Sequence, residues 1–139
     1  MPKKKLTIEE KLYNALVPVE EQPYQVPDNW CWVRLGDLVT VKGGKRIPRG
    51  YSLSDSKTKH PYIRVSDFME YGVDISRIKY ISDDVFEKIK NYTISTSDIY
   101  ISIAGSIGKV GIIPSDLEGA NLTENAAKLT NIRGSHQRY

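Results

Sequence analysis

The sequence predicts an α+β fold: a single domain with a mixed, β-hairpin-containing sheet and short helices, preceded by an N-terminal helix and a proline-rich strap. Apolar residues alternate with other residues in short runs such as 99–104, which is typical of strands. Helix start signals occur near residues 7 and 82, and glycine or proline separates the segments. The chain has 139 residues, 40% of them hydrophobic, which suits one folded domain. We place a lead-in at residues 1–27 and the domain at residues 28–139.

The lead-in begins with a predicted helix over residues 7–16. Thr7 and Glu10 have the spacing of a capping box, in which each side chain accepts a hydrogen bond from the other residue's backbone. Ile8, Leu12 and Leu16 recur at every fourth position and form a narrow apolar stripe. Because so short a helix is marginal in water, we expect it to dock on another surface. Three prolines follow and keep the chain extended as a strap.

The first half of the domain is predicted to contain two strands and a loop. Trp30 and Trp32 alternate as on a strand, and residues 35–39 suit a turn of helix. Residues 42–51, with three glycines and a proline, form a loop. Residues 60–68 predict a strand that enters the interior through Tyr62, Ile63 and Val65.

The second half is predicted to contain a helix, a hairpin and one further strand. Ser82 is a suitable N-cap for a helix that turns Val85, Phe86 and Ile89 toward the core, while paired aspartates in its first turn suit the helix dipole. Ile99, Ile101 and Ile103 are the apolar members of a strand that a glycine-rich turn with Gly105, Gly108 and Gly111 joins to a second strand. Residues 121–132 supply one more strand.

The glycine-rich stretch 101–111, ISIAGSIGKVG, contains a Gly-Lys pair and invites comparison with a phosphate-binding P-loop. A P-loop needs a glycine five residues before that pair and a serine or threonine after the lysine. Ile103 and Val110 occupy those two positions. The stretch is therefore predicted to be a hairpin and not a nucleotide site.

Catalytic and metal sites have no support in the sequence. Cys31 is the only cysteine, which excludes an internal disulfide, and its place between two tryptophans predicts a buried, inert thiol. His60 and His136 do not stand at ligand spacing with it, so we expect no metal, and His60 is predicted to be a surface or polar-contact residue. Without a signal peptide or an apolar run long enough for a membrane, a cytoplasmic location is expected.

The basic charge is concentrated in one segment. Net charge is +3, but residues 34–64 carry eight lysines and arginines against two aspartates. Such a surface attracts polyanions, nucleic acid above all, although lysines that merely solvate a loop explain the charge equally well. If the segment binds DNA, the expected phosphate or base contacts are Lys45, Arg46, Arg49, Tyr51, Lys57, Lys59 and Arg64.

The order of motifs resembles a known family. VPDNWCWVRLGDLVTVKGGKRIP is followed by HPYIRVSDF, YISDDVF, SDIYISIAGSIGKVGII and LTENAAKL. Together with the lead-in KKKLTIEEKLYNALVPVEEQPYQVP, this order resembles the specificity (S) subunit of type I restriction–modification systems, and within it an amino-terminal target recognition domain. The resemblance covers residues 3–134.

This resemblance implies a non-catalytic subunit that binds double-stranded DNA and reads one half of a bipartite target through the major groove. Modification (methyltransferase) subunits would bring S-adenosylmethionine, and a restriction subunit would bring ATP and Mg²⁺, so that the chain itself binds no cofactor. Lys109, in the hairpin turn, is a further candidate for a phosphate contact.

The sequence departs from the family in having no helical spacer and no second recognition domain, and we expect the first domain to be unfinished after Gly134. It therefore resembles a truncated S subunit or a fragment. One alternative is a protein-interaction module that docks through the helix at 7–16. Another is a standalone nuclease or methyltransferase.

Overall fold

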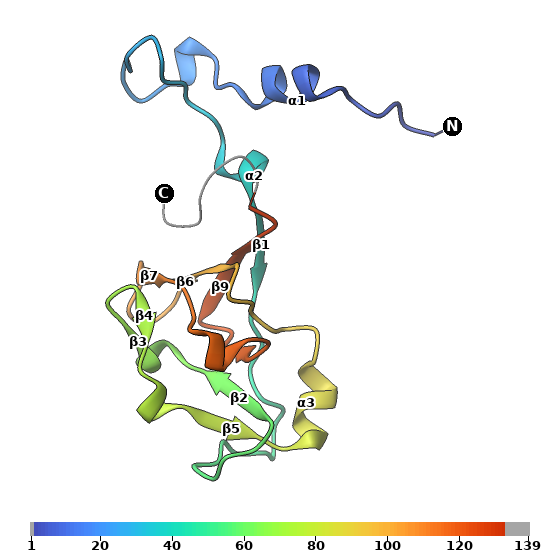
Figure 1. Ribbon diagram of the computed structural model, residues 1–139, viewed down its shortest axis with the longest axis vertical. Coiled ribbons are helices and arrows are strands. Elements are labelled where there is room, and N and C mark those ends of the chain that lie inside the picture. The colour runs from blue at the N-terminus through green and yellow to red at the C-terminus, as the bar shows by residue number, and fades with distance from the viewer. Residues whose placement is uncertain (1, 133–139) are drawn as a thin grey trace.

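The structure is a computed structural model that describes residues 2–132. Among these residues the α-helices are α1 (Ile8–Ala15), α2 (Leu35–Leu38) and α3 (Asp83–Ile89) (Figure 1). The strands are β1 (Thr40–Gly43), β2 (His60–Ile63), β3 (Phe68–Met69), β4 (Gly72–Val73), β5 (Lys79–Ile81), β6 (Ile99–Ser102), β7 (Val110–Gly111), β8 (Asn121–Leu122) and β9 (Ala126–Thr130). Short 3-10 turns lie at Val19–Glu21, Val65–Asp67, Ile75–Arg77 and Ser115–Leu117.

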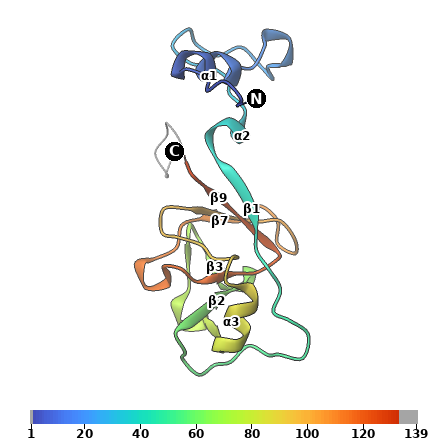
Figure 2. The same ribbon diagram turned by 90° about the vertical axis from the view of Figure 1, so that its right-hand side faces the viewer.

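The strands form three sheets, so the α+β class is confirmed with more sheets than expected. The order β1-β9-β6-β7 gives a four-stranded antiparallel sheet that contains the predicted hairpin, β6–β7. The order β5-β2-β8 gives a mixed sheet, in which β2 pairs parallel to β8 and antiparallel to β5. Strands β3 and β4 form a separate two-stranded hairpin. The two larger sheets lie one above the other, with α3 beside the mixed one (Figures 1 and 2).

Two hydrophobic clusters hold these layers together. The larger one joins β2, β6 and β8 through Ile63, Tyr100 and Leu122, all of which are buried. The smaller one packs Val85 and Ile89 of α3 against the mixed sheet. The prediction for α3 is confirmed, because the Ser82 hydroxyl accepts a hydrogen bond from the Val85 amide at 3.3 Å.

The predicted hairpin is present, but the apolar members of its first strand are not the residues that it buries. Tyr100 and Ser102 are fully buried, whereas Ile103 is 50% exposed and Ile99 and Ile101 are half-buried. The Tyr100 ring stacks on Phe68 with 3.7 Å between ring centroids, which explains its burial. Alternation gives the period of a strand, but the packing partners decide which face turns inward.

The lead-in stands away from the sheets, with α1 beyond α2 and β1 (Figures 1 and 2). The capping box is confirmed: the Thr7 amide donates to Glu10 Oε2 at 2.8 Å, and the Glu10 amide donates to Thr7 Oγ1 at 3.2 Å. No residue of α1 is buried. An isolated bridge pairs Leu16, directly after α1, with Val33, which lies beyond the lead-in.

The predicted strand around the two tryptophans is absent, because the chain turns there. The Trp30 amide donates to the Pro27 carbonyl at 2.8 Å, and Trp30 is 69% exposed. Trp32 instead packs edge-on against Tyr24, with 4.9 Å between centroids, and its Nε1 donates to the Tyr24 carbonyl at 3.0 Å. Cys31 between them is exposed, so the prediction of a buried thiol was wrong.

Two strands, β8 and β9, replace the single strand predicted over residues 121–132, because residues 123–125 turn between them. Val65 was predicted on the interior strand, but it begins a 3-10 turn after β2 and is half-buried. His136 and the expected unfinished end after Gly134 lie outside the described residues.

Candidate nucleic-acid interface

Four chain segments meet at one end of the four-stranded sheet. Strand β1 ends there, because Gly43 pairs with Ala127 near the start of β9. Strand β6 ends beside it, since Ser102 pairs with Ala126, and β7 begins next to β6. We call the loops that leave this end the strand-end surface, defined as residues 44–46, 103–109 and 123–125.

The turn at residues 123–125 links the other two parts of this surface. On one side, the Asn125 carbonyl accepts hydrogen bonds from the Ile103 and Ala104 amides at 2.8 and 3.2 Å. On the other side, the Gly44 amide donates to the Ala126 carbonyl at 3.1 Å. A Cβ atom at Gly44 would lie 2.0 Å from the Thr123 carbonyl oxygen, so this close approach requires glycine.

Arg46 carries the charge of the first segment and is paired across the surface. Its Nε donates to Glu124 Oε1 at 2.8 Å, although its side chain stays 78% exposed. That hydrogen bond raises the pKa of Arg46 above its usual value. Partial burial acts to raise the pKa of Glu124, but hydrogen bonds from Arg46, its own backbone and Thr123 lower it overall. Both groups are therefore charged at neutral pH.

Ser102 holds the glycine-rich loop, residues 103–109, over the end of β6. Its hydroxyl donates to the Ser106 carbonyl and accepts from the Lys109 amide at 2.8 Å. Gly105 and Gly108 have φ angles of +72° and +87°, where glycine is the least strained residue. Lys109 and Ile107 remain exposed, so the predicted phosphate contact lies on the strand-end surface.

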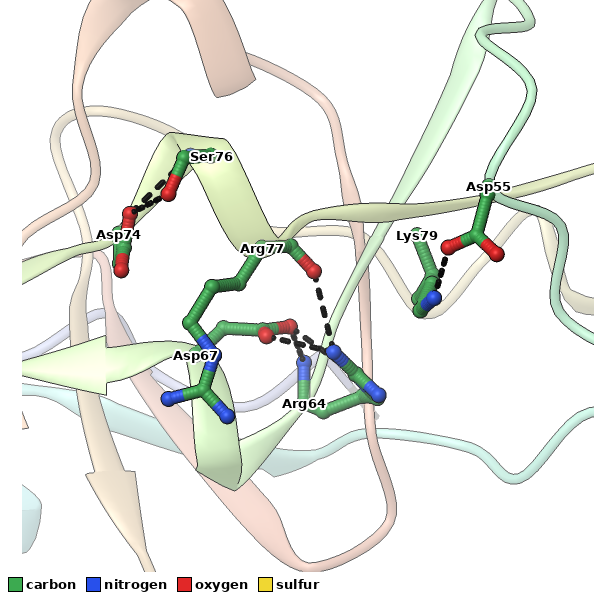
Figure 3. A network of polar contacts seen from close by, with 7 residues as sticks. All are labelled: Asp55, Arg64, Asp67, Asp74, Ser76, Arg77 and Lys79. Atoms are coloured by element: carbon green, nitrogen blue, oxygen red, sulfur yellow. Dashed lines mark hydrogen bonds and ion pairs between the residues drawn. The ribbon is translucent and has the colours of Figure 1, made fainter.

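The basic loop, residues 44–59, continues from this surface along the mixed sheet (Figure 1). Ile47 and Leu53 pack against the smaller core cluster, and Ser54 bridges Tyr80 of β5. Asp55 forms an ion pair with Lys79 (Figure 3). The outward side chains are those of the predicted contacts Lys45, Arg46, Arg49, Tyr51, Lys57 and Lys59, all exposed.

Arg64, the remaining predicted contact, has a structural partner (Figure 3). Its guanidinium binds the buried carboxylate of Asp67 through two nitrogens, at 2.8 and 3.2 Å, and also donates to the Arg77 carbonyl at 3.0 Å. Three of its five N–H donors are thus engaged within the fold. The exposed side chain of Arg77, which the sequence did not single out, lies beside this pair (Figure 3).

A second hairpin lies beside the glycine-rich loop. The turn at Glu70 and Tyr71 joins β3 to β4, and the Ile112 amide donates to the Tyr71 carbonyl at 3.2 Å. The buried hydroxyl of Tyr100 lies under this turn, 2.5 Å from the Gly72 carbonyl oxygen and 3.2 Å from that of Met69. Burial raises the pKa of Tyr100 to about 12.

Tyr71 itself has an unusual backbone and side chain. Its φ angle is +58°, a left-handed conformation that costs a residue with a bulky side chain about 1 kcal/mol or more. Its side chain is 74% exposed and, with Met69 and Lys109, lines a cavity of about 410 Å³ between the two hairpins. Sequence reasoning missed Tyr71, because no pattern distinguishes it from the other eight tyrosines.

The described residues include no group of three histidine, cysteine or acidic side chains arranged to hold a metal ion. His60 makes the polar contact that the sequence led us to expect: its Nε2 lies 2.7 Å from Asp83 Oδ1, and its ring stacks on Phe86 at 4.0 Å. Within residues 2–132, no helix has the length and apolar character needed to cross a membrane.

Comparison with protein families finds one that covers most of the chain. A family model described as the type I restriction modification DNA specificity domain matches residues 27–133. The EcoBI type I restriction enzyme specificity subunit of Escherichia coli is 24% identical over 131 residues, which cover 91% of this chain and 27% of that protein. The EcoAI specificity subunit of the same organism is 25% identical over 104 residues, which cover 73% of this chain and 17% of that protein.

Solved structures show the same fold. The crystal structure of the HsdS subunit from Thermoanaerobacter tengcongensis matches 91% of this chain and 29% of its own, with a TM-score of 0.59 and 16% identity. A chain from a study of complex assembly and conformational transition in the type I R-M system covers the same shares, with a TM-score of 0.64 and 17% identity. This chain therefore spans less than a third of the length of these relatives.

Proposed function

This chain belongs to the family of type I restriction modification DNA specificity domains, and we propose that it binds double-stranded DNA and reads one half of a bipartite target. In this proposal it directs methylation and restriction without catalysing either. Modification subunits supply S-adenosylmethionine chemistry, and a restriction subunit supplies the ATP- and Mg²⁺-dependent steps.

The observation that carries the proposal is the convergence of exposed cations on the strand-end surface. Lys45, Arg46 and Lys109 come from segments far apart in the sequence, and the turn at 123–125 brings these segments together. Four strands about 4.8 Å apart span roughly 14 Å, close to the width of about 12 Å of a DNA major groove. The exposed cations of the basic loop extend this charge along the mixed sheet.

The side chains divide by chemistry into two roles. Lys45, Lys57, Lys59 and Lys109 are point charges suited to phosphates. Arg46 can bracket guanine O6 and N7, and its partner Glu124 fixes the direction of its guanidinium. Arg49 and Tyr51, on either side of Gly50, are also exposed, and we assign them to the rim of the interface.

Selection of duplexes from a random library by the full chain tests this proposal. If three or four cations neutralise phosphates, log affinity falls with log salt with a slope of about −3. Lys109→Gln should make the slope shallower by about one, because one phosphate contact is lost. Lys11→Gln, in the lead-in, is the matched control and should leave the slope unchanged. Failure to enrich any duplex, or equal slopes for both variants, would contradict the proposal.

The lead-in supports a second candidate function, a protein-interaction module. Its apolar stripe is exposed, with Ile8 at 76% and Leu12 at 63%. A concave cavity of about 790 Å³ lies along the strap between Leu16 and Trp32. Apolar surface of this kind favours a protein partner over a nucleic acid.

Deletion of residues 2–22 separates the two candidates. A DNA reader retains its affinity for the selected duplex after the deletion, because the strand-end surface is intact. An interaction module loses binding to a co-expressed modification subunit, which affinity co-purification detects. Loss of DNA binding with retained subunit binding would reverse both assignments.

A further inference from the structure

We propose that Tyr71 contacts bases of the DNA target and contributes to sequence discrimination. The turn at Glu70 and Tyr71 would then extend the strand-end surface by one hairpin. This inference rests on the proposed function, and it assigns a role to a residue outside the basic segment.

The fold does not need a tyrosine at position 71. Among the described residues, Tyr71 and Asn131 are the only non-glycine residues with a positive φ angle. Asparagine tolerates that conformation, but a tyrosine is strained in it, so glycine or asparagine would suit the turn better. The Tyr71 side chain is 74% exposed and makes no hydrogen bond or ring contact in the part of the chain that the structure describes. Neither the backbone nor the core therefore explains this residue.

The turn at Glu70 and Tyr71 is held in place by contacts on both of its sides. The Tyr100 hydroxyl bonds the carbonyl groups on both sides of the turn, and the Arg64–Asp67 pair anchors the segment that leads into it (Figure 3). A Cβ atom at Gly111 would lie 2.5 Å from the Tyr71 carbonyl carbon, so β7 packs directly on the turn. An exposed aromatic ring on a fixed backbone loses little conformational entropy on binding.

The turn at Glu70 and Tyr71 is continuous with the candidate interface. The cavity of about 410 Å³ is lined by Met69, Glu70 and Tyr71 on one side, and by Gly108 and Lys109 on the other. Tyr71 also bridges Gly111 of β7, the edge strand of the four-stranded sheet. Contacts therefore run without a break from Arg46, through the turn at 123–125 and the glycine-rich loop, to Tyr71.

The chemistry of the turn favours bases over phosphates. The neighbouring Glu70 is exposed, and its negative charge repels the phosphate backbone. A carboxylate can accept a hydrogen bond from the cytosine amino group, and an aromatic ring can pack on a thymine methyl group or a base face. Tyr71 should therefore affect the choice of sequence more than the binding of arbitrary DNA.

The test uses the full chain, the duplex enriched by selection and a scrambled duplex of equal length. Tyr71→Asn should lower the ratio of specific to non-specific affinity by roughly tenfold, the size expected for one base contact. The salt slope should not change, because no phosphate contact is lost. Tyr13→Asn, at a 78% exposed tyrosine of the lead-in, is the control and should leave both quantities unchanged.

A second variant, Tyr71→Gly, distinguishes the loss of a base contact from a defect in folding. Glycine adopts the left-handed conformation without strain, so the melting temperature of the Tyr71→Gly variant should equal or exceed that of the unchanged chain. Its ratio of specific to non-specific affinity should fall as in Tyr71→Asn. An unchanged ratio in both variants overturns the inference but leaves the proposed function intact. A shallower slope with an unchanged ratio makes Tyr71 a phosphate contact and also overturns it. If the unchanged chain enriches no duplex, the proposed function fails, and this inference fails with it.

Discussion

The lead-in and the domain each contain a short capped helix, but only the helix of the domain packs against a neighbouring surface. In the lead-in, a capped helix carries an apolar stripe, yet none of its described residues is buried. In the domain, α3 has a comparable cap, and it buries Val85 and Ile89 because the mixed sheet lies against it. Local signals are enough to form a helix, but burial requires a second surface that the lead-in does not have within residues 2–132.

The largest expected effect is the contrast between one core residue and one lead-in residue. Ile63 is fully buried, so Ile63→Ala should lower the free energy of unfolding by about 3 kcal/mol. Leu12 is 63% exposed, so Leu12→Ala should change it by less than about 0.5 kcal/mol. Urea denaturation followed by tryptophan fluorescence and circular dichroism measures both. A loss for Leu12→Ala as large as that for Ile63→Ala would show that the lead-in packs in solution.

The next effect concerns the buried ion pair in Figure 3. Asp67→Ala should cost about 2 kcal/mol, because it leaves the partly buried guanidinium of Arg64 without its partner. Asp55→Ala is the matched control. Its carboxylate pairs with Lys79 but is 86% exposed, so the cost should stay within about 0.5 kcal/mol. Equal losses of unfolding free energy in the two variants would contradict the structural role assigned to Arg64.

A smaller effect depends on pH. The pKa of Tyr100 is raised to about 12, above the value near 10 of an unfolded tyrosine, so its contribution to stability is complete below about pH 10 and is lost as the pH rises toward 12. Tyr100→Phe should cost about 1 kcal/mol at neutral pH through the lost hydrogen bonds.

Denaturation of both proteins at about pH 9 and about pH 11 measures this contribution. Tyr100→Phe should show a smaller loss of stability between the two pH values than the unchanged chain. The pH dependence of stability that remains in Tyr100→Phe would include a contribution from Tyr62, because burial also raises the pKa of Tyr62. Identical pH profiles would contradict the assignment to Tyr100.

The smallest expected effect concerns the reactivity of the Cys31 thiol and involves no change in the free energy of unfolding. Cys31 is exposed in the turn that follows the lead-in, so its thiol should react with a disulfide reagent in the folded protein about as fast as in urea. The absorbance of the thiolate that Cys31 releases from the reagent measures both rates. Protection by a factor of ten or more would mean that this turn is covered in solution.

Sequence patterns predicted the elements whose signals are local. The capping box at Thr7 marked α1, the N-cap Ser82 marked α3, and period-two alternation marked the β6–β7 hairpin. They did not predict which face of β6 is buried, because that depends on Phe68 and on carbonyl groups that satisfy Tyr100 and Ser102 from other segments. They also mistook the turn at Trp30 for a strand, since two alternating aromatic residues fit both.

The candidate site was only partly predictable for the same reason. Charge density pointed to Lys45, Arg46 and the rest of the basic loop, and the hairpin turn pointed to Lys109. The register of β1, β9 and β6 brings Lys45, Arg46 and Lys109 to one end of the sheet, and no short motif encodes that register. The ion pair of Arg64 and the strained turn at Tyr71 likewise depend on contacts between segments.

The close approach of Gly44 to the Thr123 carbonyl has a consequence for how the proposed DNA specificity can change. This glycine fixes the start of the basic loop to the sheet, and the bridge from Ser54 to Tyr80 fixes the loop a second time. Between these two anchors, the outward side chains at 45, 46, 49 and 51 contribute nothing to either core cluster. Under the proposed function, these outward side chains can change and alter DNA recognition, while Ile47 and Leu53 keep the segment packed on an unchanged scaffold.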